Sequence, residues 1–301
     1  MRVLHIDTGR DLRGGQRQVL LLLELLSTAG HECKLLARTA GLLRTEASRL
    51  GVAVLPATLR NVWSHSAKAD IVHVHDAHAH SLAAVASPRP FVVSRRVAFA
   101  VRRSFVSRWK YRRARRFIAV SKFVAAQLYS AGIPSEKIDV VYDAAPRITT
   151  ANEWSPDAPV VALANDDPMK GRDLVQLAAA KSGHQVVFSK DLSSDFRRAS
   201  MFVYITRSEG LGSAALLAMS MGVPVIASRT GGLQEVFEDR ISGLYVENEP
   251  AQIASAMCRI TNDAEFACRL IREGRARVAT QFNTHRLLEG TLASYARALG
   301  A

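Results

Sequence analysis

A glycine-rich stretch in the second half of the chain, Ser208–Ser242, has the residue types of an anion-binding site. Glu209 directly precedes Gly210 and Gly212, and a second glycine pair follows at Gly231-Gly232. Glycine-rich turns that lead into helices leave unpaired N–H groups, and the helix dipole adds to their attraction for phosphate. Because a carboxylate beside such turns suits sugar hydroxyls, the stretch predicts paired phosphate sites next to a hydrogen-bonding acid.

The elements that position this stretch can be predicted from its pattern. We expect Ser213 to cap a helix over Ala214–Met221, which Gly222 ends. The apolar run Val223–Ala227 predicts a buried strand, after which Gly231-Gly232 opens a further helix start. Upstream, Lys170 comes at the start of a helix predicted over Asp173–Lys181, where its ammonium could meet a diphosphate.

Histidines cluster in the first half, within Asp70–His80. His73 and His75 share one face of a predicted strand, Ile71–His75, and His78 and His80 are expected in the loop beyond it. Metal binding, hydrogen bonding to a substrate by His78 or His80, and a structural role compete here. No second cluster of histidines or carboxylates completes a metal shell, so no metal is expected.

The first strand, Arg2–Ile6, is followed by a polar loop that ends in Gly14-Gly15, and then by a helix over Gln16–Thr28. This βαβ pattern predicts a parallel sheet. At the carboxyl edge of its first strand the two glycines would let a ligand approach the backbone, although a plain turn explains them equally well.

The segment Arg95–Phe117 contains ten basic residues and no acidic one, in a chain with net charge +13. Val101, Phe105 and Trp109 recur at helical spacing, which predicts an amphipathic helix with an arginine rim. A solvated basic face, an anionic membrane surface and nucleic acid are the candidate partners, and the membrane is favoured. The expected contact residues are Arg102, Arg103, Phe105, Trp109, Arg112, Arg113 and Arg116, whereas Arg96 ends a strand at the ligand edge.

Composition limits the remaining possibilities. At 301 residues and 48% apolar content, the chain can form two ordinary domains and is not disordered. No segment is apolar enough to span a bilayer, and Met1 begins a strand at once, so no signal peptide is expected. Cys33, Cys258 and Cys268 are isolated and are expected to be reduced core thiols of a cytoplasmic protein. The segment Arg147–Pro159 separates two successions of alternating strands and helices.

Together these motifs resemble a family 4 (glycogen-synthase-like) retaining glycosyltransferase over nearly the whole chain. The resemblance rests on Gly14-Gly15-Gln16, DIVHVHDAHAH, Ala119-Val-Ser121, Lys170-Gly171 and above all EGLGSAALLAMSMGVPVIASRTGGLQEV. It implies an α/β GT-B fold, with two Rossmann-like doubly wound parallel-sheet domains facing across a cleft. Residues 1–147 would form the acceptor-side domain and 156–284 the nucleotide-sugar domain, with a helix over about 285–301 packing back on the first.

The resemblance also implies roles for particular residues. Glu209 would hydrogen-bond the donor sugar, Gly14 and Gly15 would contact the donor, and no metal or cofactor would be needed. The diphosphate would bind Lys170 and the backbone of Gly210, Leu211, Gly212 and Ser213. Two positions depart from the family. Leu217 replaces the second acid of the Glu-x7-Glu motif, and Asn165 replaces an arginine, whose charge Arg95 or Arg96 could restore.

We therefore expect sugar transfer from a nucleotide-diphosphate sugar to a cell-envelope acceptor, such as lipopolysaccharide core or another lipid-linked glycan. The expected location is the inner face of the cytoplasmic membrane. A nucleotide-sugar 2-epimerase is the first alternative. The second is a degenerate, non-catalytic protein that binds nucleotide sugars or nucleic acid, for which Leu217 and Asn165 argue.

Overall fold

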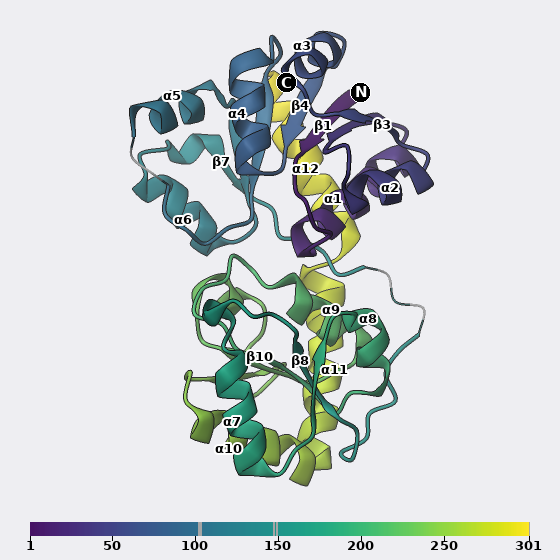
Figure 1. The fold of residues 1–301 in the computed structure, drawn as a ribbon, viewed down its shortest axis with the longest axis vertical. Coiled ribbons are helices and arrows are strands. Elements are labelled where there is room, and N and C mark those ends of the chain that lie inside the picture. Colours follow the sequence, from purple (N-terminus) through teal and green to yellow (C-terminus); the bar gives the residue numbers. More distant parts are fainter. Residues whose placement is uncertain (102–103, 147, 149, 301) are drawn as a thin grey trace. The chain divides into compact units, whose positions relative to one another are not determined.

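The computed structural model describes residues 1–101, 104–146, 148 and 150–300. The chain forms two compact units (Figure 1). Unit 1 combines Met1–Asp143 with the C-terminal segment Thr284–Ala301, and unit 2 comprises Ala144–Asn283. Each unit is an α/β domain with a parallel sheet, as the alternation of strand and helix patterns predicted.

The sheet of unit 1 has seven strands within the described residues, in the order β3-β2-β1-β4-β5-β6-β7. Strands β1 and β4 are almost wholly buried, as in sheets that helices cover on both faces. The strand order reverses between them, so the crevice outside their carboxyl ends is where such a sheet binds ligands. The strands are β1 (Arg2–Asp7), β2 (Glu32–Ala37), β3 (Ala53–Pro56), β4 (Ile71–Val74), β5 (Phe91–Arg95), β6 (Arg116–Ala119) and β7 (Ile138–Val140).

Helices connect these strands. Helix α4 begins directly after β4 because the Asp76 carboxylate accepts the N–H groups of His78 and Ala79 as an N-cap. The helices of unit 1 are α1 (Gly14–Thr28), α2 (Leu42–Arg49), α3 (Leu59–Ser66), α4 (Ala77–Ala86), α5 (Phe105–Arg113), α6 (Lys122–Ser130), a short 3₁₀ turn at Ser135–Lys137 and α12 (Thr284–Leu299).

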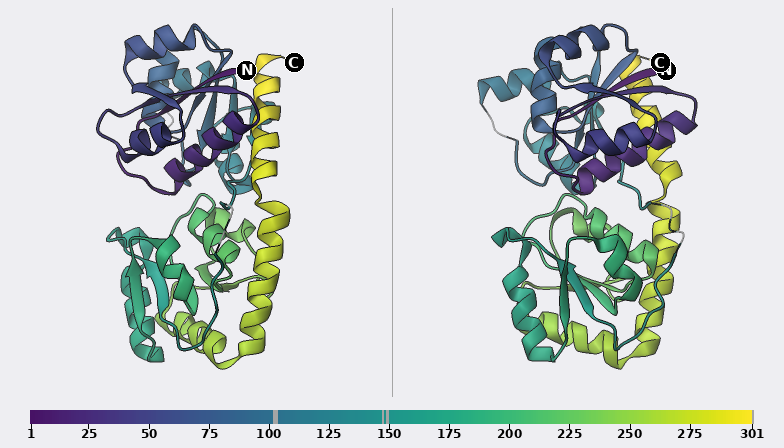
Figure 2. Two further views of the ribbon diagram at one scale, coloured as in Figure 1. Left: turned by 90° about the vertical axis from the view of Figure 1, so that its right-hand side faces the viewer. Right: turned by 45° about the vertical axis from the view of Figure 1, so that its right-hand side comes forward.

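Helix α12 belongs to unit 1 although it ends the chain, and it runs along β5, β6 and β7 beside α1 (Figure 2). Asp139 in β7 holds it there through Ser294 Oγ and Arg297 Nη2, both at 2.7 Å. The same carboxylate also binds Arg116 of β6 at 2.7 and 2.8 Å. Since Asp139 is 9% exposed, each partner that it binds compensates for the loss of water.

The sheet of unit 2 has five strands within the described residues, in the order β12-β11-β10-β8-β9. Its order reverses between β8 and β10, so the loops after these two strands flank the ligand-binding position of the sheet. The strands are β8 (Val160–Leu163), β9 (Val186–Ser189), β10 (Met201–Tyr204), β11 (Val225–Ser228) and β12 (Leu244–Val246). The helices are α7 (Arg172–Ser182), α8 (Leu192–Asp195), α9 (Ser213–Met221), α10 (Pro250–Asn262) and α11 (Ala264–Gln281), with 3₁₀ turns at Pro168–Lys170, Phe196–Arg198 and Gly231–Glu235.

Several local predictions were wrong. Ser213 is the first residue of α9 and not its cap, because Gly212 occupies the N-cap position and no side chain caps the helix. The second glycine pair opens a 3₁₀ turn and not an α-helix. Gly14 and Gly15 form the first turn of α1 and do not precede it. Helix α3 was not predicted. From residues 193 to 199 the pattern predicts a single short helix, whereas the structure has the short α-helix α8 followed by a 3₁₀ turn.

The cysteine prediction needs one correction. All three cysteines are free, but Cys268 is exposed and therefore not a core thiol, whereas Cys33 and Cys258 are half-buried. Among the described residues, none of the helices combines the length and apolar character needed to cross a bilayer.

Candidate functional site

Lys170 and Glu209 meet at the carboxyl edge of the unit 2 sheet. Lys170 follows β8 and Glu209 follows β10, the two strands that flank the reversal in strand order. Lys170 Nζ lies 2.9 Å from Glu209 Oε2, and the two side chains are 22% and 18% exposed. The structure thus brings together the cation and the acid that the sequence analysis selected.

The backbone of Glu209 is also held in place. Its carbonyl oxygen accepts a hydrogen bond from Gly232 N at 3.0 Å, which joins the first glycine loop to the second. A Cβ atom on Gly231 would lie 2.3 Å from that carbonyl oxygen, and Gly231 has φ +50°. Only glycine permits this close approach, so the backbone of the second glycine pair packs directly against that of Glu209 and fixes its position.

The loop that carries Lys170 is shaped by side chains that bond to nearby backbone groups. Asn165 Oδ1 accepts from Asp167 N at 3.0 Å, and Asp167 Oδ1 accepts from Met169 N at 2.9 Å. Asn165, predicted at the diphosphate site, thus shapes the loop. Arg207, which the sequence analysis did not select, is exposed and bonds to this loop through its backbone N at 2.8 Å from Met169 O.

The predicted anion-binding backbone lies at the N-terminus of α9. Gly210 N donates to Glu209 Oε1 at 3.1 Å. Leu211 is buried, while Ser213 starts the helix, whose first N–H groups have no acceptor within the helix itself. Lys170, Glu209 and this helix end therefore form one continuous polar edge of unit 2.

In unit 1, Arg96 lies over the start of α1. Its Cδ is 3.6 Å from the position that a Cβ on Gly15 would occupy. The guanidinium is already paired, because Nε is 3.1 Å from Asp143 Oδ1, and Nη1 is 3.4 Å from His75 Nδ1. Arg96 thus lies beside Gly15 at the start of α1, and its charge is balanced by Asp143.

Three buried histidines form a cluster in the unit 1 sheet. His5 pairs in register with His73, and His5 Nδ1 lies 3.0 Å from His75 Nε2. His73 contacts Tyr295 Oη and Ser94 Oγ, both at 2.7 Å. His5 was not among the predicted site residues, although in a doubly wound sheet β1 and β4 are neighbours, which places His5 opposite His73.

The histidine cluster is the group among the described residues whose ligand atoms lie close enough for a metal ion. Burial lowers the pKa of His5 to about 3, and burial holds the pKa values of His73 and His75 well below the usual range. Both ring nitrogens of His73 are already engaged. The contacts describe a neutral hydrogen-bonded network that joins β1, β4, β5 and α12.

His78 and His80 lie in α4 and not in a loop. His78 is exposed, and its ring has no partner among the described residues. His80 is buried, packs edge-on against Phe91 and Tyr111, and contacts Lys110 O at 3.1 Å through Nε2. Of the two, only His78 is open to a substrate.

The basic stretch is divided between helix α5, which is largely exposed, and strand β6, which is largely buried. Helix α5 buries none of its residues, and Phe105, Val106 and Trp109 are 79%, 70% and 43% exposed. Arg112 is exposed as well. The side chain of Arg113 donates hydrogen bonds to Ala84 O in α4 and to Ser87 O directly after that helix.

Arg116 was wrongly predicted as a surface contact. It is 13% exposed and its guanidinium binds Asp139, because it lies on β6 and not on the helix. Arg102 and Arg103 lie outside the described residues.

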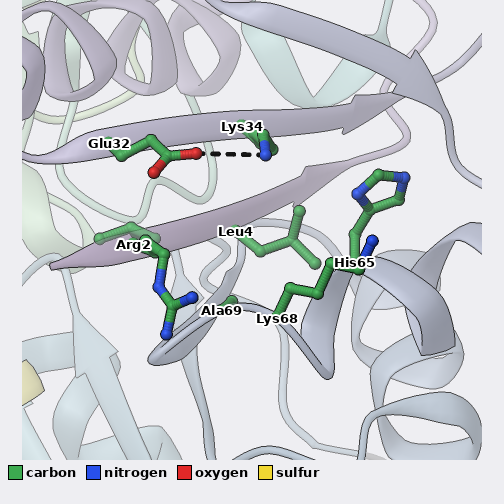
Figure 3. A pocket seen from close by; sticks show the side chains of 8 residues that line it. Arg2, Leu4, Glu32, Lys34, His65, Lys68 and Ala69 are labelled. Carbon is green, nitrogen blue, oxygen red and sulfur yellow. Dashed lines mark ion pairs between the residues drawn. The ribbon is translucent and has the colours of Figure 1, made fainter.

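A pocket of about 250 Å³ lies at the amino ends of strands β1 and β2, away from the carboxyl edge of the unit 1 sheet (Figure 3). Its lining comes from the first residues of β1 and β2 and from the end of α3, including Arg2, Lys34, His65 and Lys68. Because open parallel sheets bind ligands at their carboxyl ends, we assign no ligand to this pocket.

Two family models match the chain. Residues 12–145 match Glycosyltransferase Family 4, and residues 123–263 match Glycosyl transferases group 1. The D-inositol 3-phosphate glycosyltransferase of Salinispora arenicola is 32% identical over 112 residues, which are 37% of this chain and 25% of that protein. The chain thus spans about a quarter of the length of this relative.

Solved structures match almost the whole chain. Anabaena HepE in complex with UDP and glucose has a TM-score of 0.86 at 16% identity and covers 97% of this chain and 98% of its own. The lipopolysaccharide outer core galactosyltransferase WaaB has a TM-score of 0.72 at 12% identity, with coverage of 98% and 99%.

The fold is therefore GT-B, as predicted. The two family matches support a glycosyltransferase of the family-4-like group.

Proposed function

We propose that the protein is a retaining glycosyltransferase that moves a sugar from a nucleotide-diphosphate sugar to a cell-envelope acceptor. The observation that carries this proposal is the Lys170–Glu209 pair beside the N-terminus of α9. An ammonium and helix N–H groups suit the diphosphate, and a carboxylate suits the sugar hydroxyls. UDP is the first candidate nucleotide, since HepE binds it.

In this proposal the leaving diphosphate is stabilised by Lys170 and by backbone N–H groups of Gly210–Ser213, without a metal or cofactor. Its departing oxygen takes the proton of the acceptor hydroxyl, and the hydroxyl attacks from the same face of the sugar. No protein nucleophile is then required. Unit 1 serves as the acceptor-side domain, and His78 is its exposed candidate for hydrogen bonding to the acceptor.

We further propose that α5 contacts an anionic membrane surface on the inner face of the cytoplasmic membrane. Exposed Phe105, Val106 and Trp109 stand among arginines on a helix that has no fully buried residue. Apolar side chains inserted at the lipid interface and cations at the headgroups together favour such docking. A lipid-linked or lipopolysaccharide acceptor would fit that location, and the structural neighbour WaaB is a lipopolysaccharide outer core galactosyltransferase.

The test of the transfer proposal begins with a thermal-shift screen against UDP-, GDP-, ADP- and CMP-linked sugars. Glu209→Ala should then lower turnover of the best donor by roughly two to three orders of magnitude, because the sugar loses its carboxylate partner. Binding of the nucleotide diphosphate should persist. Glu265→Ala, at an exposed position of α11, is the matched control. Unchanged turnover in Glu209→Ala would remove the proposed role, and free sugar released without acceptor would favour an epimerase.

A further inference from the structure

Tyr204 binds the same carboxylate oxygen of Glu209 as Lys170 does. Tyr204 ends β10, five residues before Glu209, and is 5% exposed. Its hydroxyl donates to Glu209 Oε2 at 2.5 Å, while Lys170 Nζ lies 2.9 Å from that oxygen. Glu209 Oε1 accepts from Gly210 N at 3.1 Å. The carboxylate is therefore held by one flexible charged donor and by two donors in fixed positions.

The ring of Tyr204 has little freedom to move. It stacks on Phe202 with ring centroids 5.3 Å apart, and Phe202 packs in turn against Phe196 at 4.9 Å. On the side of the first glycine loop, a Cβ on Gly212 would lie 3.3 Å from Tyr204 Cε1. Burial and the neighbouring Glu209 raise the pKa of Tyr204 well above its usual value, so the hydroxyl keeps its proton and remains a donor.

A bound diphosphate would act differently on the two side-chain donors. Its negative charge attracts the ammonium of Lys170, whose long side chain can turn towards it. Tyr204 is neutral and its ring is fixed, so its hydrogen bond to Glu209 would persist. An ionised carboxylate has about four lone-pair positions, so positions remain for sugar hydroxyls.

We infer that Tyr204 is a positioning residue, which holds the Glu209 carboxylate in place for the donor sugar when Lys170 engages the diphosphate. This inference rests on the proposed function. It assigns to Tyr204 an effect on the sugar half of the donor and none on the nucleotide half, because Tyr204 acts only through Glu209.

The experiment is isothermal titration of UDP-glucose and of UDP into wild type, Tyr204→Phe, Glu209→Ala and the double variant. Tyr204→Phe should weaken UDP-glucose binding about tenfold, as expected for a lost hydrogen bond to a charged group, and leave UDP binding within about twofold. In the Glu209→Ala background the same change should have no further effect. Tyr245→Phe is the control, since this half-buried tyrosine of unit 2 also loses a hydrogen-bonded hydroxyl, but one that bonds to Leu233 O and Phe237 O.

Equal losses for UDP and UDP-glucose in Tyr204→Phe, or a further loss in the double variant, would overturn the inference. If Glu209→Ala binds UDP-glucose like wild type, the proposed function fails instead. Urea unfolding of the same four proteins gives a readout that needs no donor. The effect of the double variant on the unfolding equilibrium constant should differ about fivefold from the product of the two single effects. If the single effects simply multiply, the hydrogen bond between Tyr204 and Glu209 is contradicted.

Discussion

Tyr295 Oη in α12 lies 2.7 Å from His73 Nδ1 in β4, although the two residues are 222 positions apart in the chain. Both are buried, and the other nitrogen of His73 contacts Ser94 Oγ of β5. A single hydrogen-bonded path thus joins the C-terminal helix to the centre of the unit 1 sheet. The neutral ring can donate from one nitrogen and accept at the other, and burial holds the pKa of His73 well below its usual value because it disfavours the charged ring.

Acid should therefore destabilise unit 1. Burial lowers the pKa of His5 and His80 to about 3 and that of His73 and His75 well below 6.5, so the folded state stays neutral where the unfolded chain takes up protons. Stability is fully present above the unfolded pKa of about 6.5 and is lost as the pH falls from there towards the folded values. Urea unfolding followed between about pH 7.5 and pH 4 measures this loss.

A variant identifies the groups responsible. His80→Leu replaces one buried histidine by an apolar side chain of similar volume. The unfolded chain then takes up one proton fewer, so the slope of the unfolding free energy against pH should decrease by about 1.4 kcal/mol per pH unit between about pH 6 and pH 4. His285, which is exposed in α12, gives the control variant His285→Leu. An unchanged pH dependence in His80→Leu would show that this histidine is not a neutral buried group.

Gly231→Ala should damage both stability and donor binding. The new Cβ would lie 2.3 Å from Glu209 O, so the first glycine loop must move. Gly30→Ala is the matched control, because it also places alanine at positive φ (+80°) but meets no atom within 4 Å. We expect Gly231→Ala to lose about 2 kcal/mol more unfolding free energy than Gly30→Ala, and at least about tenfold in UDP-glucose affinity. Equal losses in the two variants would leave only backbone strain as the cause.

Membrane binding should depend on α5. Replacing Arg108 and Arg112 by serine should weaken binding to vesicles that contain phosphatidylglycerol by about 2 kcal/mol, or roughly thirtyfold, since each arginine near the surface contributes about 1 kcal/mol. Trp109→Ser should weaken it as well. Trp63→Ser tests another exposed tryptophan, in α3. If the protein sediments equally with neutral and anionic vesicles, or if these substitutions leave its sedimentation unchanged, a membrane role for α5 is contradicted.

Apart from α3, the order of the strands and α-helices could be predicted from the sequence because each of these elements has a local signature. Buried strands such as Arg2–Asp7 and Ile71–Val74 are short apolar runs, and the helices between them have apolar residues at helical spacing. The polar edge of unit 2 was predictable for the same reason. Lys170 and Glu209 each follow a strand, and the carboxyl ends of parallel strands lie at one edge of a sheet.

The sequence by itself thus determined the two α/β domains and placed Lys170 and Glu209 each after a strand of the second sheet, whereas their contact comes from the structure. Only the tertiary structure decided which polar side chains are already paired. Arg116 forms an ion pair with Asp139 and Arg96 forms one with Asp143, while Tyr204 donates a hydrogen bond to Glu209. A charge or hydroxyl in a sequence has no fixed partner, because its partner depends on which strands become neighbours and how far each side chain is removed from water.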